Sequence, residues 1–118
     1  MLTKAIAIID DEIDLVNLYK EALETNDYKV CTFTNPTDAL DKLQNQLENY
    51  ALVISDYRMP VMNGNDLCTK LINLNPKLKI IIISAFQDIE YDKSKFIWLN
   101  KPILISQLLK TVKENLTE

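Results

Sequence analysis

Residues 52–64 read Leu-Val-Ile-Ser-Asp-Tyr-Arg-Met-Pro-Val-Met-Asn-Gly, and this stretch decides the fold. The apolar run 51–54 shows no alternation of polar and apolar residues, which predicts a short strand buried on both faces. The proline and glycine that follow predict a tight loop before the next helix. Asp56 lies where the strand ends, and ligands of open α/β sheets bind just beyond the carboxyl ends of their strands. The stretch therefore predicts a central parallel strand that presents a carboxylate at a binding edge.

The rest of the chain alternates strand patterns with helix patterns. Four consecutive isoleucines at 80–83 are typical of a parallel strand covered on both faces, and the partly polar segment 28–33 is typical of an edge strand. Helices are predicted where apolar residues recur every three or four positions. Predicted strands cover residues 5–9, 28–33, 51–54, 79–84 and 96–100, and predicted helices cover 12–25, 36–47, 65–74 and 106–116. This order predicts an α/β fold, a doubly wound five-stranded parallel sheet with helices on both faces.

The connection at 87–95 does not follow this pattern. It is only nine residues long and is rich in charged residues, and its apolar residues alternate instead of repeating at helical spacing. We expect one or two helical turns at most. The fourth helix is therefore predicted to be shortened or irregular.

Length and composition limit the class of protein. The 118 residues fit one domain, 1–118, and a formal charge of −4 argues against a nucleic-acid groove, which needs a basic stripe. No apolar stretch approaches the ~20 residues of a membrane span, and no signal-peptide pattern precedes the first strand. We therefore expect a cytoplasmic protein with no membrane or nucleic-acid partner. Cys31 and Cys68 match no zinc motif and are expected to be buried, reduced thiols.

Polar side chains follow several of the predicted strands. Asp10 and Asp11 follow the first strand, Asp56 the third, Ser84 the fourth and Lys101 the fifth. Because the carboxyl ends of parallel strands share one edge, these side chains are expected to converge there. Three neighbouring carboxylates repel one another unless a cation lies between them, and oxygen ligands suit Mg²⁺ or Mn²⁺.

The same residues suit phosphoryl transfer. An aspartate beside a metal ion and a lysine can act as a nucleophile and form an aspartyl phosphate. Lys101 would neutralise charge on the transferring group, while the hydroxyl of Ser84 and the backbone amide of Ala85 can donate to its oxygens. The pattern therefore indicates an Asp56 phosphoacceptor.

Each residue alone also has a plain structural interpretation. Asp11 would cap the first helix, with Asp14 as the capping-box acid. Asp56 alone could be a turn residue, Ser84 a hydroxyl at a strand end, and Lys101 part of a loop. The functional interpretation depends on their joint occurrence at the ends of four strands.

The chain resembles the receiver domain of two-component response regulators over nearly its whole length. The matching residues are Ile9-Asp10-Asp11-Glu12, Asp56-Tyr57-Arg58-Met59-Pro60 with Asn63-Gly64, Ser84-Ala85 and Lys101-Pro102. The resemblance implies a flavodoxin-like fold with strand order 2-1-3-4-5. It also implies a switch, not a turnover enzyme, although such a switch assists its own phosphorylation and dephosphorylation.

The resemblance assigns a role to each matching position. Asp56 is implied to be the phosphoacceptor, and Trp98 occupies the place of a rotating aromatic switch that acts with Ser84. The remaining roles are metal binding by Asp10, Asp11, Asp56 and the backbone carbonyl of Arg58, and phosphoryl binding by Ser84, Ala85 and Lys101. The implied phosphodonor is a histidine kinase or a histidine-phosphotransfer protein, and this chain has no histidine of its own.

Two departures from the family concern the output surface. The interval between Ser84 and Lys101 is short for the family, and Leu104 stands where an acidic helix cap is common. The face formed by the fourth helix, the fifth strand and the last helix is therefore predicted to bind an unidentified downstream protein or a second copy of the chain. The alternative is that Ile103 and Leu104 fold back into the core.

Two other functions fit part of the pattern. A phosphatase of the haloacid-dehalogenase type also uses a nucleophilic Asp, a Lys and Mg²⁺, but it needs a second Asp where this chain has Arg58. A receiver-like module that binds partners without phosphorylation is the other alternative. Such a module would need neither the acid pair nor Lys101.

Overall fold

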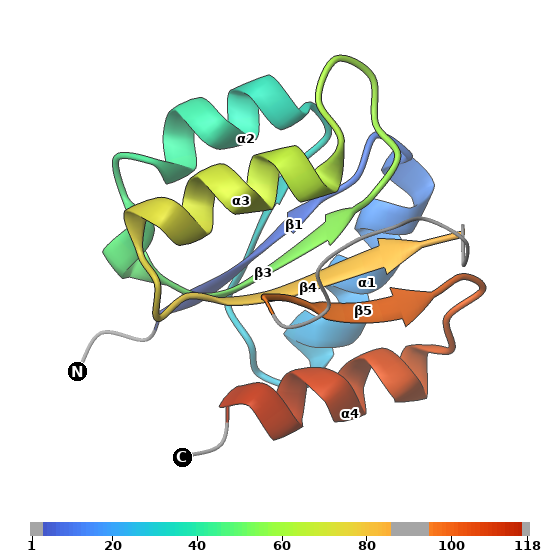
Figure 1. Cartoon of the computed structure of the whole chain (residues 1–118). Helices are drawn as coiled ribbons and strands as arrows, with labels where there is room; N and C mark the ends of the chain where they lie inside the picture. Colours follow the sequence, from blue (N-terminus) through green and yellow to red (C-terminus); the bar gives the residue numbers. More distant parts are fainter. Residues whose placement is uncertain (1–3, 86–94, 117–118) are drawn as a thin grey trace.

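The chain forms one parallel sheet with helices on both faces (Figure 1). The structure is a computed structural model, and it describes residues 4–85 and 95–116. The strand order is β2-β1-β3-β4-β5, and every neighbouring pair is parallel. The prediction of a doubly wound sheet with order 2-1-3-4-5 is confirmed.

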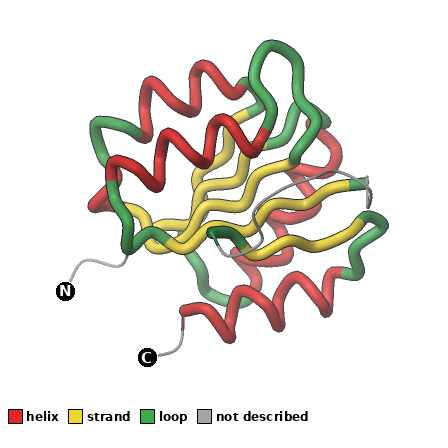
Figure 2. The backbone as a smooth tube through the Cα atoms, in the orientation of Figure 1, coloured by secondary structure: helices red, strands yellow, loops and turns green. Residues whose placement is uncertain are grey.

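The strands and helices alternate along the chain as predicted, and Figure 2 shows how they are connected. The strands are β1 (Ala5–Ile9), β2 (Val30–Phe33), β3 (Tyr50–Asp56), β4 (Lys79–Ser84) and β5 (Ile97–Asn100). The helices are α1 (Ile13–Thr25), α2 (Pro36–Leu43), α3 (Gly64–Leu74) and α4 (Ile105–Leu116), with a short 3₁₀ turn at Leu47–Asn49. Helices α2 and α3 cover one face of the sheet, and α1 and α4 cover the other (Figure 1).

Each face of the sheet has its own hydrophobic cluster, because successive side chains of a strand point to opposite faces. In β4, Ile80 and Ile82 pack with α2 and α3, while Ile81 and Ile83 pack with α1 and α4. Burial on both sides explains why the central strands lack an alternating pattern. Strand β2 lies at the edge and is only half-buried, as its mixed sequence predicted.

Helix α2 is shorter than predicted. Asn35 caps it by accepting hydrogen bonds from the amides of Thr37 (2.8 Å) and Asp38 (3.2 Å), and Pro36 occupies the first helical position. The helix ends at Leu43, and Leu47 is buried from the separate 3₁₀ turn. The leucine spacing therefore predicted burial correctly but did not reveal the break in the backbone.

The predicted irregular helix at 87–95 lies almost entirely outside the described residues. Among the helices of the described part of the chain, none combines the length and the hydrophobicity that crossing a bilayer requires. Both cysteines are free thiols, but only Cys68 is buried, while Cys31 on the edge strand is half-buried. Burial raises the pKa of the Cys68 thiol to about 12, so this thiol is inert at neutral pH.

Gly64 sets the distance between α3 and the end of β3. It is the chain's one glycine, it is buried, and its N–H donates a 2.7 Å hydrogen bond to the carbonyl of Tyr57. A Cβ at this position would collide with the backbone carbonyl oxygen of Asp56. Glycine is required here by close backbone approach, which keeps the loop tight against the backbone of Asp56.

We predict that Gly64→Ala destabilises the protein by about 1–3 kcal/mol, because the added methyl group must displace backbone and not a flexible side chain. Urea denaturation measures this change. Asn65→Ala, one position later in the same helix, is the matched control and should change stability by less than about 0.5 kcal/mol. Equal stability of the glycine variant and the wild type would show that the loop can shift freely.

Candidate functional site

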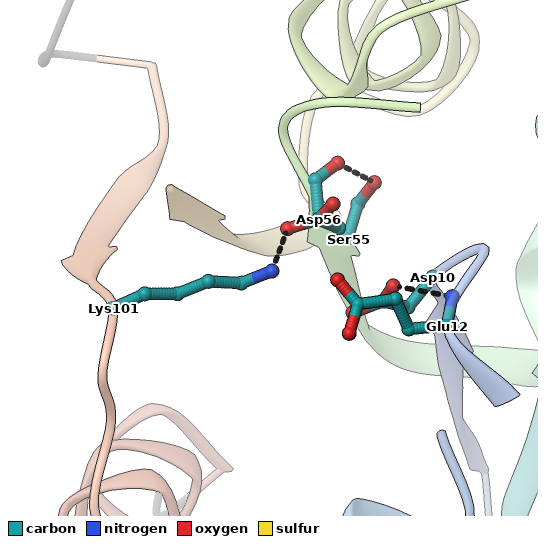
Figure 3. A network of polar contacts seen from close by, with 5 residues as sticks. All are labelled: Asp10, Glu12, Ser55, Asp56 and Lys101. Carbon is teal, nitrogen blue, oxygen red and sulfur yellow. Dashed lines mark hydrogen bonds and ion pairs between the residues drawn. The ribbon is translucent and has the colours of Figure 1, made fainter. Parts of the chain in front are cut away.

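The carboxyl ends of β1, β3 and β5 bring charged side chains together at one edge of the sheet. Figure 3 shows Asp10, Asp56 and Lys101 approaching one another from three different elements. Asp10 follows β1, Asp56 ends β3 and Lys101 follows β5. The convergence that the sequence predicted is therefore present in the structure.

Lys101 and Asp56 form an ion pair. The Lys101 Nζ lies 2.7 Å from Asp56 Oδ1, and the Asp56 side chain is only 5% exposed. Burial raises the pKa of Asp56, and the hydrogen bond and charge of Lys101 oppose that rise. Burial also disfavours the charged form of Lys101, but the nearby Asp56 outweighs it, so the pKa of Lys101 is raised and the ammonium stays charged.

The backbone fixes the lysine in this position. The Lys101 N–H donates a 2.8 Å hydrogen bond to the carbonyl of Ser84, which ties the end of β5 to the end of β4. The peptide bond between Lys101 and Pro102 is cis. The side chain of Lys101 extends from this point across the end of β4 to reach Asp56 (Figure 3).

Asp10 is the more buried member of the acid pair. Its side chain is 2% exposed, and its Oδ1 accepts a 2.9 Å hydrogen bond from the amide of Glu12. The pKa of Asp10 is raised to about 6, chiefly by burial and also by the negative charge of Asp56, while the hydrogen bond from Glu12 opposes the rise. The prediction that Asp11 caps α1 is wrong, because Glu12 occupies the N-cap position and makes no capping bond with its side chain.

The three acids fit a hard divalent cation. Asp10, Asp11 and Asp56 each offer a carboxylate oxygen, and these oxygens lie within 4.8 Å of one another. Two of the acids are buried and the third is exposed, so the cluster opens toward solvent through Asp11. Three carboxylates beside a single ammonium leave excess negative charge, and all-oxygen donors are what Mg²⁺ prefers.

The other predicted residues surround this centre. Ser84 is buried at the end of β4, next to β3, and Ala85 follows it at the surface. Arg58 lies in the loop after β3 with its side chain exposed. Trp98 lies in β5 and is half-buried among residues of the α2–α3 face.

Two residues near the centre had no role in the sequence interpretation. The Tyr57 ring packs against Trp98, with centroids 5.8 Å apart and planes inclined by 46°. The Ser55 hydroxyl is buried and donates a 2.9 Å hydrogen bond to the carbonyl of Asp56. A polar residue at the end of an apolar strand was the available signal for Ser55, whereas nothing in the sequence pairs Tyr57 with Trp98.

Comparison with known proteins agrees with this geometry. A family model for the response regulator receiver domain matches residues 6–113. The chain belongs to this family. Receiver domains of this family are parts of two-component signalling systems, and the Asp10–Asp11–Asp56 cluster stands where such domains have their acidic pocket.

Individual receivers are similar over most of the chain. The response regulator RppA of Synechocystis is 31% identical over 109 residues, which is 88% of this chain and 47% of that protein. The receiver protein CpdR of Brucella abortus is 34% identical over 70% of this chain and 68% of its own length. Thus the chain spans about half of RppA and two thirds of CpdR.

Solved structures show the same architecture. The receiver domain protein of Methanospirillum hungatei, described as CheY-like, superposes with a TM-score of 0.84 at 26% identity, covering 95% of this chain and 92% of that one. A receiver from Clostridium thermocellum reaches a TM-score of 0.87 at 24% identity, covering 95% and 93%. The strand order of this chain is therefore that of a flavodoxin-like receiver.

We predict that Mg²⁺ raises the melting temperature of this receiver, because the ion relieves repulsion among carboxylates that are close only in the folded state. Binding to the folded state alone stabilises it by about 2.7 kcal/mol at a concentration 100 times the dissociation constant. Thermal unfolding at increasing Mg²⁺ measures this effect. The Mg²⁺-induced rise should be smaller in Asp11→Ala but intact in Asp14→Ala, an exposed acid of the first turn of α1; no rise in the wild type would contradict the metal site.

Proposed function

We propose that this receiver accepts a phosphoryl group on Asp56 from the phosphohistidine of a histidine kinase or a histidine-phosphotransfer protein. The observation that carries the proposal is the 2.7 Å contact between Asp56 and Lys101 beside Asp10 and Asp11. An ammonium already placed against the nucleophile can neutralise charge on the incoming phosphoryl oxygens. If these residues only capped a helix or stabilised turns, their side chains would not need to lie close together.

The transfer requires little covalent chemistry from the protein. An Asp56 carboxylate oxygen attacks the phosphorus, the new P–O bond forms as the P–N bond to the donor imidazole breaks, and the bonding electron pair returns to the imidazole nitrogen. The step moves one phosphoryl group and requires no oxidant or reductant. Lys101 then shifts from the carboxylate toward the phosphoryl oxygens, and positioning supplies most of the catalysis.

The acidic cluster would hold Mg²⁺ or Mn²⁺ through Asp10, Asp11 and Asp56, together with the backbone carbonyl of Arg58. The ion supplies charge neutralisation between the nucleophile and the phosphoryl group. The carboxylates of Asp10 and Asp11 would hold it against Asp56 from the β1 side. This assignment explains why two buried acids, each carrying a cost of desolvation, face each other at this edge.

The switch would follow from the same contacts. After transfer, the Ser84 hydroxyl and the Ala85 amide would donate to phosphoryl oxygens from the end of β4, next to Asp56. A shift of Ser84 changes the space beside β5, and Trp98 would respond by moving between two arrangements. The chain would act as a switch, assisting its own phosphorylation and dephosphorylation without turning over a separate substrate.

The proposal also specifies partners and setting. Residues 1–118 would act as one receiver unit in the cytoplasm, where ATP supplies the kinases that act as donors. Output would pass through another protein and not through nucleic acid, since Lys and Arg number 13 against 17 acids. A phosphorylation-independent binding module remains the alternative, and it differs in leaving Asp56 unmodified.

Phosphorylation should occur at Asp56 alone. We predict that acetyl phosphate with Mg²⁺ adds the mass of one phosphoryl group to the wild type and to Asp41→Asn, which changes an exposed acid of α2. Asp56→Asn should gain none, because its amide cannot act as the nucleophile. Intact mass spectrometry reads the result, and a phosphoryl adduct on Asp56→Asn would refute the site.

We further propose that the surface formed by β5, α4 and the loop between them binds the downstream protein or a second copy of the chain. Leu104 in this loop is 71% exposed, whereas the neighbouring Ile103 packs onto the core cluster beneath α4. The alternative that Ile103 and Leu104 both fold back into the core is therefore correct for Ile103 and wrong for Leu104. The exposed Leu104 is the apolar group that supports a binding face, and Trp98 lies on the adjoining strand β5.

Leu104→Asp should leave stability within about 0.5 kcal/mol of the wild type, as expected for an exposed side chain. We predict that phosphorylation shifts the wild type toward dimers or toward its downstream partner, and that the variant loses this shift while still accepting phosphate from acetyl phosphate. Light scattering after chromatography measures the mass. Strong destabilisation of the variant would place Leu104 in the core and contradict the proposal.

A further inference from the structure

A cavity lies at the opposite end of the sheet from Asp56. It has a volume of about 620 Å³ and is bounded by the end of α3, the loop before β4, the start of β5 and the end of α4. These elements meet at the amino ends of β4 and β5 (Figure 1). Its size falls within the range of about 300–1,000 Å³ that is typical of small-molecule sites.

Among the described residues that line this cavity, three are lysines and none is acidic. The lysines are Lys77, Lys79 and Lys95. Within the described residues, the only ion pair joins Lys101 to Asp56, so none of these three ammonium groups has a carboxylate partner there. Three lysines with no acid among the described lining residues stand out in a chain that has 17 acids and 13 bases.

Two of these lysines lie at the same end of neighbouring strands. Lys79 begins β4, and Lys95 precedes by two residues the start of β5, which pairs with β4 in parallel. Both residues are exposed, and like charges near each other repel. An anion bound between the two ammonium groups would be attracted by both.

The remaining walls of the cavity are mostly apolar. The half-buried Ile72 of α3 and the buried Phe96 contribute hydrocarbon surface from the α2–α3 side of the sheet, and the half-buried Ile97 of β5 contributes it from the other side. The side-chain amide of Asn115 on α4 adds one hydrogen-bonding group. An inorganic anion would use the lysines but would leave the apolar wall without a partner.

We propose that this cavity binds a small organic anion, a phosphate or carboxylate group attached to an apolar body. Lys79 and Lys95 contact the charged group, Lys77 adds to the positive potential at the mouth, and the apolar body lies against Ile72 and Phe96. This site is distinct from the phosphoacceptor edge and does not depend on Asp56 chemistry. The protein would thus respond to a small molecule as well as to a phosphodonor.

The test uses 1-naphthyl phosphate as the probe, titrated into the full chain without Mg²⁺ and followed by amide chemical shifts in two-dimensional NMR. We expect saturable shifts centred on residues 77–80 and 95–97. Lys79→Gln combined with Lys95→Gln should weaken binding by about tenfold or more, the loss expected when a charge-assisted hydrogen bond is removed. The double variant should fold normally, because both residues are exposed.

The matched control is Lys4→Gln combined with Lys29→Gln, which changes the net charge equally at the amino ends of β1 and β2. Its affinity for the probe should stay within about twofold of the wild type, since it removes only long-range, salt-screened attraction. Inorganic phosphate lacks the apolar body and 1-naphthol lacks the charged group, so both should bind far more weakly. Equal weakening in both double variants, equal binding of inorganic phosphate, or shifts without saturation would overturn the proposal.

Discussion

The ion pair between Lys101 and Asp56 joins the parts of this molecule that must act together. It spans from the end of β5 to the end of β3 across the end of β4, so it can form only when all three strands are in register. A buried pair of this kind contributes little net stability, because desolvation of the two charges cancels much of their attraction. Its retention at the edge where two further carboxylates gather is best explained by chemistry.

The fold supplies that edge by burying almost everything else. Strands β1, β3 and β4 are covered on both faces, and their carboxyl ends are the places where the backbone leaves the core and polar side chains can begin. Gly64 then holds the loop after β3 against the Asp56 backbone. The hydrophobic sheet and the single glycine therefore determine how closely the acids and the lysine approach.

Most of this arrangement could be predicted from the sequence. Runs of buried apolar residues identified the central strands, and the rule that parallel strands share an edge brought Asp10, Asp56, Ser84 and Lys101 together before any coordinates were known. The end of α2 could not be predicted, because Leu43 and Leu47 are both buried although the helix stops between them. The pattern of leucines reports burial and not backbone continuity.

Contacts between residues far apart in the sequence could not be predicted either. Either Asp10 or Asp11 could turn toward the start of α1, and only the packed structure shows that Asp10 accepts the amide of Glu12, the N-cap residue. The contact of Tyr57 with Trp98 depends on how β5 lies relative to the loop after β3. The gathering of Lys77, Lys79 and Lys95 at one end of the sheet likewise follows from the arrangement of the strands, which composition does not reveal.

We propose that Asp56, and no other acid of the cluster, carries the phosphoryl group. Borohydride reduction of the phosphorylated protein converts an aspartyl phosphate to homoserine, and peptide mass mapping then locates the modified residue. We expect homoserine at position 56 only, and its yield should fall sharply in Lys101→Ala. Homoserine at position 10 or 11, or none in a protein that has gained phosphoryl mass, would contradict this assignment.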